Sequence, residues 1–391
     1  MIRVRTCNHT RPSSKPLRHL CSMLFCIQNK IHTSGGFMSA ERLYAYVAHG
    51  PRDLSVWAMS GTGDFSKLQE LPINDRDLAP GTPIGRFAAL CVSPDRRFLF
   101  ASDRAAPYGI RSWAIDREKG TLTYLGDSPA ADSSPYIITD PPGNFLLAAH
   151  NPVDPDRRTG FVSVAAIREG FVQAPHQVIR TPPKTHAIQV DASGRFVLLP
   201  CCDADVVVRL RFDCRTGLLD SDTLSPLVTR PGAGPRHCVF HPGNRFAYVN
   251  NEYDGTIYAY SFDPRDGAMS EIQVVQTRPA SAGPDENVRV GDLRISPNGK
   301  FLFTTVRSGS TVVGFAVDPR TGLLTSIGQT QVDGEARSLA FDPLGRFLVV
   351  NGRLTHTAHT YRLDGETGAL DKVSAFRAPD HPGWIELVNL S

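Results

Sequence analysis

The stretch GAGPRHCVFHPGNRFAYVNNEYDG, residues 232–255, has the pattern of a β-hairpin. An apolar run, CVF, leads into a Pro-Gly-Asn turn, and a second apolar run, FAYV, follows the turn. Charged residues stand at the open end of this hairpin. Arg236 and His237 begin the first strand, and Glu252 follows the second. Because the two strands are antiparallel, Arg236 and Glu252 should lie side by side.

The hairpin is one copy of a repeat. Five other segments share its strand, tight turn and apolar strand: VSPDRRFLFAS, TDPPGNFLLAA, VDASGRFVLLP, ISPNGKFLFTT and FDPLGRFLVVN. Each copy has a phenylalanine at the start of its second strand, and these residues are 46 to 55 positions apart: Phe98, Phe145, Phe196, Phe246, Phe301 and Phe347. A period of this length indicates a repeat architecture.

A second hairpin alternates with the first and occurs in seven copies, of which VGFAVDPRTGLL is one. Each copy alternates apolar and polar residues and then turns at a glycine: Gly63, Gly120, Gly170, Gly217, Gly267, Gly322 and Gly368. Glycine adopts the positive φ that such hairpin turns require.

Two hairpins per repeat give four antiparallel strands, so the sequence predicts an all-β, seven-bladed β-propeller over residues 41–391. The segment GWIELVNL near the C-terminus resembles only the first strand of a repeat, and RLYAYVAHG near the N-terminus resembles only the second. We therefore expect the two ends to share one blade and so close the ring, which removes two exposed sheet edges. A (β/α)₈ barrel needs helical periodicity between its strands, and none is found.

Residues 1–40 are interpreted as a basic extension outside the fold, which is disordered or the product of an over-long start at Met1; the alternative is a transit or signal peptide. They carry six lysines and arginines and no acid, so removing them changes the net charge from +3 to −3. This mildly acidic remainder does not suggest a nucleic-acid partner. No apolar run is long enough to span a bilayer, and the eight cysteines lack metal-site spacing. We expect a cytoplasmic protein with reduced thiols, plausibly monomeric.

The repeat places charged residues together at one mouth of the propeller channel. Ten residues before each phenylalanine lies the start of a first strand, and six residues after it lies the end of a second strand. The ionisable residues at these positions, together with His49 of the shared blade, are His186, Arg236, Arg337, Arg104, Glu252, Arg307 and Arg353. Ionisable groups that converge in a concave site are the default hypothesis for an active site.

The chemistry of this cluster suits a small anion, because arginine forks bind carboxylate or phosphate oxygens. The chain contains no P-loop, GxGxxG, HExxH or nucleophile elbow, so the sequence predicts acid–base chemistry without a cofactor or a metal. Alternation along the strand predicts that His237 points away from Arg236, into the blade. The alternative for Glu252 and Arg236 is a purely structural ion pair. Trp57, Trp113 and Trp384 are expected to pack between blades.

The chain resembles the seven-bladed propeller lactonase family, which includes bacterial 6-phosphogluconolactonases and a fungal carboxy-cis,cis-muconate cyclase. The segments that carry the resemblance are GAGPRHCVFHPGNRFAYVNNE, LRISPNGKFLF and the repeated DPRTGLL. The resemblance covers residues 41–391. It implies that His186, Arg236, Glu252 and Arg307 form the active site, with His237, Arg337, Arg104, Arg353 and His49 as further substrate-binding candidates. The segment TVR at 305–307 departs from the SNR common among relatives.

The resemblance implies a lactonase that acts on 6-phospho-D-glucono-1,5-lactone in the pentose phosphate pathway. In this hypothesis Glu252 activates water, Arg236 and Arg307 hold the phosphate or the developing oxyanion, and His186 passes a proton to the ring oxygen. One alternative is a cycloisomerase of a muconate-type dicarboxylate. The other is a non-catalytic propeller that binds a partner. The segment PASAGPDENVRVGD, residues 279–292, is expected to form a loop over the mouth.

Overall fold

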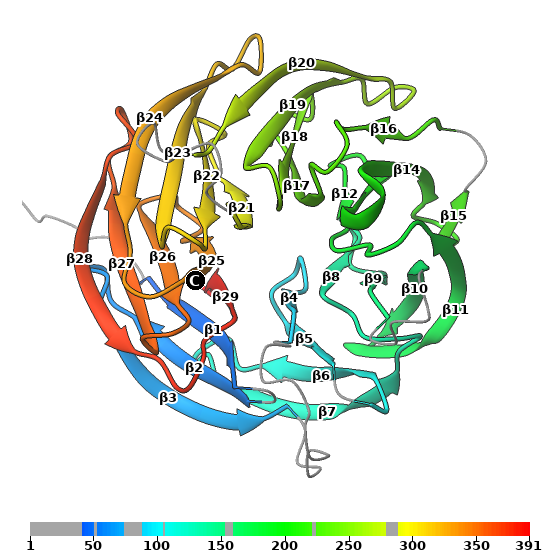
Figure 1. Cartoon of the computed structure of the whole chain (residues 1–391). Coiled ribbons are helices and arrows are strands. Elements are labelled where there is room, and N and C mark those ends of the chain that lie inside the picture. Colours follow the sequence, from blue (N-terminus) through cyan, green and yellow to red (C-terminus); the bar gives the residue numbers. More distant parts are fainter. Residues whose placement is uncertain are drawn as a thin grey trace, which may run out of the picture. The chain divides into compact units, whose positions relative to one another are not determined.

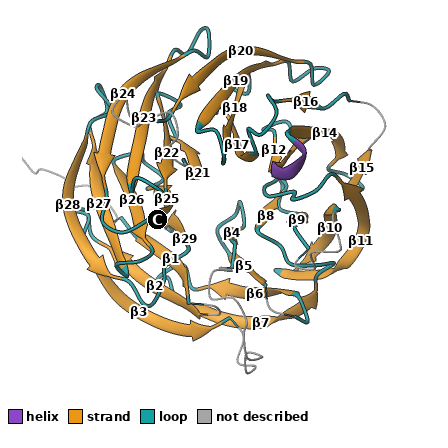
Figure 2. Ribbon diagram, viewed as in Figure 1, coloured by secondary structure: helices purple, strands orange, loops and turns teal. Residues whose placement is uncertain are grey.

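The computed structural model describes residues 41–50, 53–73, 88–104, 106–152, 159–220, 224–278 and 288–391. Within these ranges the chain forms strands β1 to β29 and one short 3-10 helix, η1 (Cys202–Ala204) (Figure 2). The predicted extension, residues 1–40, lies outside the described residues, as do residues 279–287 of the loop expected over the mouth.

The strands form seven antiparallel sheets set around a common centre, as the sequence predicts (Figure 1). We number these sheets as blades 1 to 7. Blade 1 joins the two ends of the chain in the order β29 (Trp384–Asn389), β1 (Leu43–His49), β2 (Asp53–Met59) and β3 (Phe65–Pro72). Ala48 pairs with Trp384 and Leu43 with Asn389, so the prediction that the two ends share a blade is confirmed.

Blades 2 to 4 follow in chain order. Blade 2 contains β4 (Leu90–Val92), β5 (Phe98–Asp103), β6 (Gly109–Ile115) and β7 (Leu122–Pro129). Blade 3 contains β8 (Tyr136–Thr139), β9 (Phe145–His150), β10 (Gly160–Arg168) and β11 (Phe171–Thr181). Blade 4 contains β12 (Gln189–Val190), β13 (Phe196–Cys201), β14 (Val206–Asp213), β15 (Leu218–Asp220) and β16 (Leu227–Val228). Strands β15 and β16 both pair with β14, so together they form the outer strand of blade 4.

Blades 5 to 7 complete the ring. Blade 5 contains β17 (Pro235–Phe240), β18 (Phe246–Asn251), β19 (Thr256–Phe262) and β20 (Met269–Gln276). Blade 6 contains β21 (Val290–Ile295), β22 (Phe301–Val306), β23 (Thr311–Val317) and β24 (Leu324–Gln331). Blade 7 contains β25 (Ala336–Phe341), β26 (Phe347–Gly352), β27 (Thr357–Leu363) and β28 (Leu370–Arg377). The first strand of each blade faces the centre in Figure 1, and the last strand lies at the rim.

Burial explains why the middle strands have continuous apolar sequences. Every residue of β1, β13, β18, β22 and β26 is buried. The rim strand β11 instead alternates half-buried and exposed residues along most of its length. A strand that packs against neighbouring blades on both faces has no solvent-exposed face. Its sequence therefore lacks the alternation of apolar and polar residues that a half-solvated strand shows.

The ring is held together by aromatic rings that lie on the turn glycines of the next blade. A Cβ added to Gly322 in blade 6 would lie 2.3 Å from Cδ1 of Phe246 in blade 5. The same close approach recurs at Gly120, Gly170, Gly217, Gly267 and Gly368, whose aromatic neighbours are Tyr44, Phe98, Phe145, Phe196 and Phe301. Gly63 in blade 1 meets Phe347 of blade 7 at 3.2 Å, so the last blade contacts the first in the same manner. The aromatic residue of one hairpin repeat and the turn glycine of the other therefore contact each other where neighbouring blades pack.

We expect Gly322→Ala to lower the free energy of unfolding by about 2 kcal/mol or more. Alanine at a φ of +75° costs about 1–2 kcal/mol, and overlap with the Phe246 ring adds to this cost. Gly365→Ala is the matched control, because no atom lies within 4 Å of its added Cβ. The midpoints of urea unfolding measure both effects. Equal midpoints for the two variants would show that these glycine contacts do not stabilise the ring.

Candidate active site

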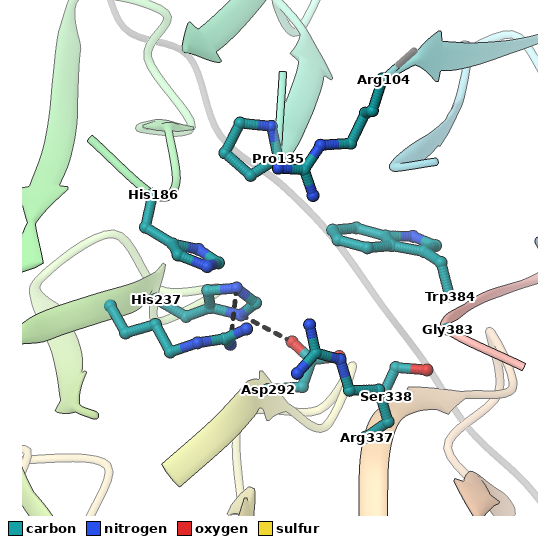
Figure 3. A pocket seen from close by; sticks show the side chains of 10 residues that line it. Arg104, Pro135, His186, His237, Asp292, Arg337, Ser338, Gly383 and Trp384 are labelled. Carbon is teal, nitrogen blue, oxygen red and sulfur yellow. Dashed lines mark hydrogen bonds and ion pairs between the residues drawn. The ribbon is translucent and has the colours of Figure 1, made fainter. Parts of the chain in front are cut away.

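A pocket lies among residues from the inner strands of the blades and the segments beside them (Figure 3). All seven blades contribute to its walls. The lining residues are Gly383, Trp384, Arg104, Pro135, His186, Arg236, His237, Asp292, Arg337 and Ser338. His186 and His237 lie on one side of it and Trp384 on the other (Figure 3).

Three neighbouring first strands reach the pocket with the same irregularity. In β17 the pairing passes from Pro235–Asn251 directly to His237–Asn250, which leaves Arg236 as an extra residue. Strand β21 has one extra residue between Val290 and Leu293, and β25 has Arg337 between Ala336 and Ser338. A β-bulge of this kind breaks the alternation and re-aims side chains. Consecutive residues can therefore both face the pocket.

The bulge in β17 corrects the prediction for His237. Alternation predicts that His237 points away from Arg236, whereas both side chains line the pocket. The Arg236 Nη1 lies 3.0 Å from Nε2 of His237. Because an arginine can only donate, Nε2 accepts this hydrogen bond and carries no proton. The Arg236 Nη1 also donates to the Gly291 carbonyl at 2.6 Å.

Asp292 fixes the opposite side of the His237 ring. Its Oδ1 accepts from the His237 Nδ1 at 2.9 Å, and both residues are buried. The imidazole is therefore neutral with its proton on Nδ1. Burial, followed by the charge of Arg236, lowers the pKa of His237 to about 4. Burial opposes the ionisation of Asp292, but Arg294 and His237 outweigh it and hold the Asp292 pKa below its usual range. The result is a buried chain from Asp292 through His237 to Arg236.

We expect Asp292→Asn to lower kcat at least about tenfold, because His237 loses the carboxylate that keeps its proton on Nδ1. Ring ¹⁵N NMR shifts should then show mixed tautomers for His237. Asp191→Asn is the control, since Asp191 is also buried and also accepts backbone hydrogen bonds, at Ser193, Arg195 and Phe196. If both variants lost stability alike but kept wild-type kcat and His237 shifts, Asp292 would have only a structural role.

Glu252 lies beside the pocket and is surrounded by cations. Its Oε1 accepts from the Arg307 Nη2 at 2.6 Å, and its Oε2 is 3.5 Å from the Arg236 Nε. Lys184 and Arg289 approach to 3.9 and 4.0 Å. Burial raises the pKa of the carboxyl, but the charges of Arg236, Arg307 and Lys184 outweigh this effect and lower it to about 2. Glu252 is thus a firmly held anion that orients the guanidinium groups around it.

His186 has the properties of an available base. No hydrogen bond joins its ring to any of the residues that the structure describes, and Nδ1 is buried. Its ring centroid is 5.3 Å from that of His237. Burial lowers the pKa of His186 well below its ordinary value, and the charge of Arg236 adds to this effect. The imidazole is therefore neutral at pH 7 and can accept a proton.

The structure separates the predicted residues into three groups. Arg104, His186, Arg236, His237 and Arg337 line the pocket. Glu252 contacts Arg236 of the lining, and Arg307 contacts Glu252. Arg353 and His49 do not line it. Arg353 instead forms an ion pair with Glu335 at 2.6 Å. His49 is buried at the end of β1, where burial lowers its pKa to about 4.

Besides Pro135 and Gly383, three lining residues are not expected from the sequence. Asp292 and Ser338 follow the bulged positions by one residue, as His237 does. The repeat therefore predicts that they face the pocket only when the bulge is known. Trp384, expected to pack between blades, also forms a wall of the pocket, and its Nε1 donates to Glu386 at 2.8 Å. Trp57 packs against Phe376 of the neighbouring blade 7, as expected, whereas the ring contact of Trp113 is with Tyr124 of its own blade.

Other features of the described residues add little to the site. The described cysteines are free thiols. No group of three or more His, Cys, Asp or Glu side chains is placed to hold a metal ion in the described part of the chain. Among the described residues there is also no helix long and apolar enough to cross a membrane.

Comparison with known proteins agrees with this geometry. The family described as "Lactonase, 7-bladed beta-propeller" matches residues 37–155 and 90–387. A 6-phosphogluconolactonase of Sodalis glossinidius is 30% identical over 338 residues, which are 86% of this chain and 96% of that protein. One of Pectobacterium carotovorum is 28% identical over 87% of this chain and 96% of that protein.

Solved structures share the fold. The periplasmic gluconolactonase of Pseudomonas aeruginosa is 24% identical with a TM-score of 0.77, over 89% of this chain and all of that one. A putative 6-phosphogluconolactonase of Bacteroides fragilis is 23% identical with a TM-score of 0.74, over 90% of this chain and 99% of that one. With a family match that spans the propeller and a pocket of histidines and arginines at its centre, the chain belongs to the seven-bladed β-propeller lactonase family.

Proposed function

We propose that this protein hydrolyses 6-phospho-D-glucono-1,5-lactone to 6-phosphogluconate. The observation that carries the proposal is the match to proteins named 6-phosphogluconolactonase over 96% of their length. The pocket supports it, because Arg104, Arg236 and Arg337 together suit an anionic substrate with an oxyanion-like transition state. The reaction belongs to the oxidative pentose phosphate pathway, and we place the enzyme in the cytoplasm as a monomer.

The proposed mechanism uses the neutral His186 as the base. His186 accepts a proton from a water molecule whose oxygen attacks the lactone carbonyl carbon, C1. Arg236 and Arg337 stabilise the negative charge that develops on the carbonyl oxygen. The tetrahedral intermediate then collapses with cleavage of the bond between C1 and the ring oxygen. His186 returns its proton to that oxygen, which becomes a hydroxyl group, and the new acid ionises to a carboxylate.

This division of roles differs from the hypothesis that Glu252 activates water. Glu252 does not line the pocket, and its carboxylate is engaged by Arg236 and Arg307. The His186 ring lines the pocket and has no hydrogen-bond partner among the described residues. We propose that Glu252 instead holds Arg236 and Arg307 in place. Asp292 and His237 hold Arg236 from the other side.

The test is acid release from freshly generated 6-phosphogluconolactone, followed at constant pH against spontaneous hydrolysis. We expect a large acceleration by the purified protein. A rate equal to the spontaneous one would overturn the proposal. Loss of ultraviolet absorbance from 3-carboxy-cis,cis-muconate, measured in parallel, would support the cycloisomerase alternative, in which the same arginines bind two carboxylates.

A further inference from the structure

A second group of cations lies on the outer side of Glu252. The mechanism proposed for the pocket assigns no role to some of these side chains. We call Lys184, Arg289 and Arg307 the outer cation cluster. All three lie within 4.0 Å of the carboxylate of Glu252, which Arg236 approaches from the pocket side. Asp203 contributes one more acid, 3.5 Å from Lys184. The three cations of the cluster and these two carboxylates leave a local charge of +1, and Arg236 adds a fourth cation on the pocket side.

Tyr253 holds two of these cations in position. Both side chains approach its ring, with the Lys184 Nζ 4.8 Å and the Arg289 guanidinium carbon 5.0 Å from the ring centroid. Lys184 also donates to the Tyr253 hydroxyl, which itself donates to Asp203 at 2.8 Å. Contacts of this kind reduce the rotamer entropy that two long side chains lose when they bind a ligand.

The position of Tyr253 depends on a glycine of the segment that identifies the fold. A Cβ added to Gly234 would lie 2.4 Å from Cδ2 of Tyr253, and Gly234 has a φ of +72°. Glycine at this position therefore allows both the left-handed turn and the close approach of the ring.

The outer cation cluster is accessible from solvent. The exposed fractions of the side chains are 26% for Lys184, 43% for Arg289 and 16% for Arg307, compared with 5% for Arg236. The cluster is also next to the pocket, because Arg236 lines the pocket and lies 3.5 Å from Glu252. A ligand whose reacting end lies in the pocket could thus extend its other end to these cations.

We propose that the outer cation cluster is a subsite for a phosphate monoester dianion, and that it gives the enzyme its preference for a phosphorylated lactone. The cluster keeps a net positive charge, and lysine and arginine are the side chains that bind phosphate oxygens best. The proposal rests on the proposed lactonase function. It leaves Arg236 and Arg337 to act at the lactone carbonyl.

The test compares two lactones that differ only in the phosphate group, 6-phosphoglucono-1,5-lactone and glucono-1,5-lactone. We expect Lys184→Met and Arg289→Met to lower kcat/KM for the phosphorylated lactone at least tenfold more than for the plain one. Arg230→Met is the matched control. Arg230 is half exposed but is paired one-to-one with Asp254 at 2.6 Å, so this variant should keep the wild-type ratio of the two kcat/KM values.

Binding of inorganic phosphate, measured by calorimetry, separates this proposal from the proposed function. We expect the wild-type protein and Arg230→Met to bind phosphate, and Lys184→Met and Arg289→Met to bind it at least tenfold more weakly. If the protein hydrolysed neither lactone but showed this pattern, the anion subsite would stand and the lactonase function would fail. If the variants hydrolysed both lactones in the wild-type ratio, or bound phosphate as the wild type does, the subsite would be overturned.

Discussion

Replacing His186 with glutamine is expected to lower kcat at least about a hundredfold, the loss typical of removing a general base. Glutamine has a similar reach but cannot accept the proton of the attacking water. The effect should fall on kcat more than on KM, because the proton moves only in the transition state. Initial rates of acid release from 6-phosphogluconolactone measure both constants.

His176→Gln is the matched control for this variant. His176 lies on the outer strand β11, where its Nε2 hydrogen-bonds to the Gly217 carbonyl at 3.0 Å, and it does not line the pocket. It should turn over at the wild-type rate. If His186→Gln kept full activity while Glu252→Gln lost at least about a hundredfold, the base would be Glu252 and the assignment to His186 would be wrong.

Replacing Arg236 with lysine is expected to lower kcat/KM by roughly 100- to 1,000-fold, the range for removal of one oxyanion donor. The guanidinium meets the Gly291 carbonyl, the His237 Nε2 and Glu252 at once. A lysine ammonium is a compact charge on a flexible chain and cannot reproduce this fork. The variant tests whether positive charge alone is sufficient at this position.

The control for Arg236→Lys is Arg111→Lys on β6. Arg111 is also largely buried and also contacts carboxylates, with Asp127 at 3.1 Å and Asp103 at 3.5 Å. It lies outside the pocket lining, so lysine there should affect stability and leave kcat/KM near the wild-type value. Equal losses of kcat/KM in the two variants would point to a general effect of losing a buried arginine, and would contradict the catalytic role of Arg236.

The sequence predicts the fold well because the repeat is a physical unit. A strand has a fixed rise and a turn needs particular residues, so a phenylalanine and a glycine at a constant period mark the same point of every blade. Counting back from Phe246 to Arg236 and forward to Glu252 therefore finds residues at the same end of two paired strands. The same counting finds His186, Arg307 and Arg337, which the structure brings to the pocket or beside it.

The counting fails where the backbone departs from the repeat. One extra residue in a bulge leaves no trace in the spacing of the phenylalanines, so the orientation of His237 and the role of Asp292 are not predictable from alternation. Lys184 and Arg289 lie outside the repeat-equivalent positions and reach Glu252 through long side chains. Arg353 occupies an equivalent position, but a nearby acid, Glu335, pairs with it.

The central claim is that the lactone is opened in the pocket between His186 and Trp384. The most direct test is a crystal structure of the protein with 6-phosphogluconate, the stable product of the proposed reaction. We predict that its carboxylate lies within hydrogen-bonding distance of Arg236 and Arg337, with C1 facing His186, and that its phosphate lies at Lys184 and Arg289. Product bound outside this pocket, with the pocket empty at saturating concentration, would contradict the claim.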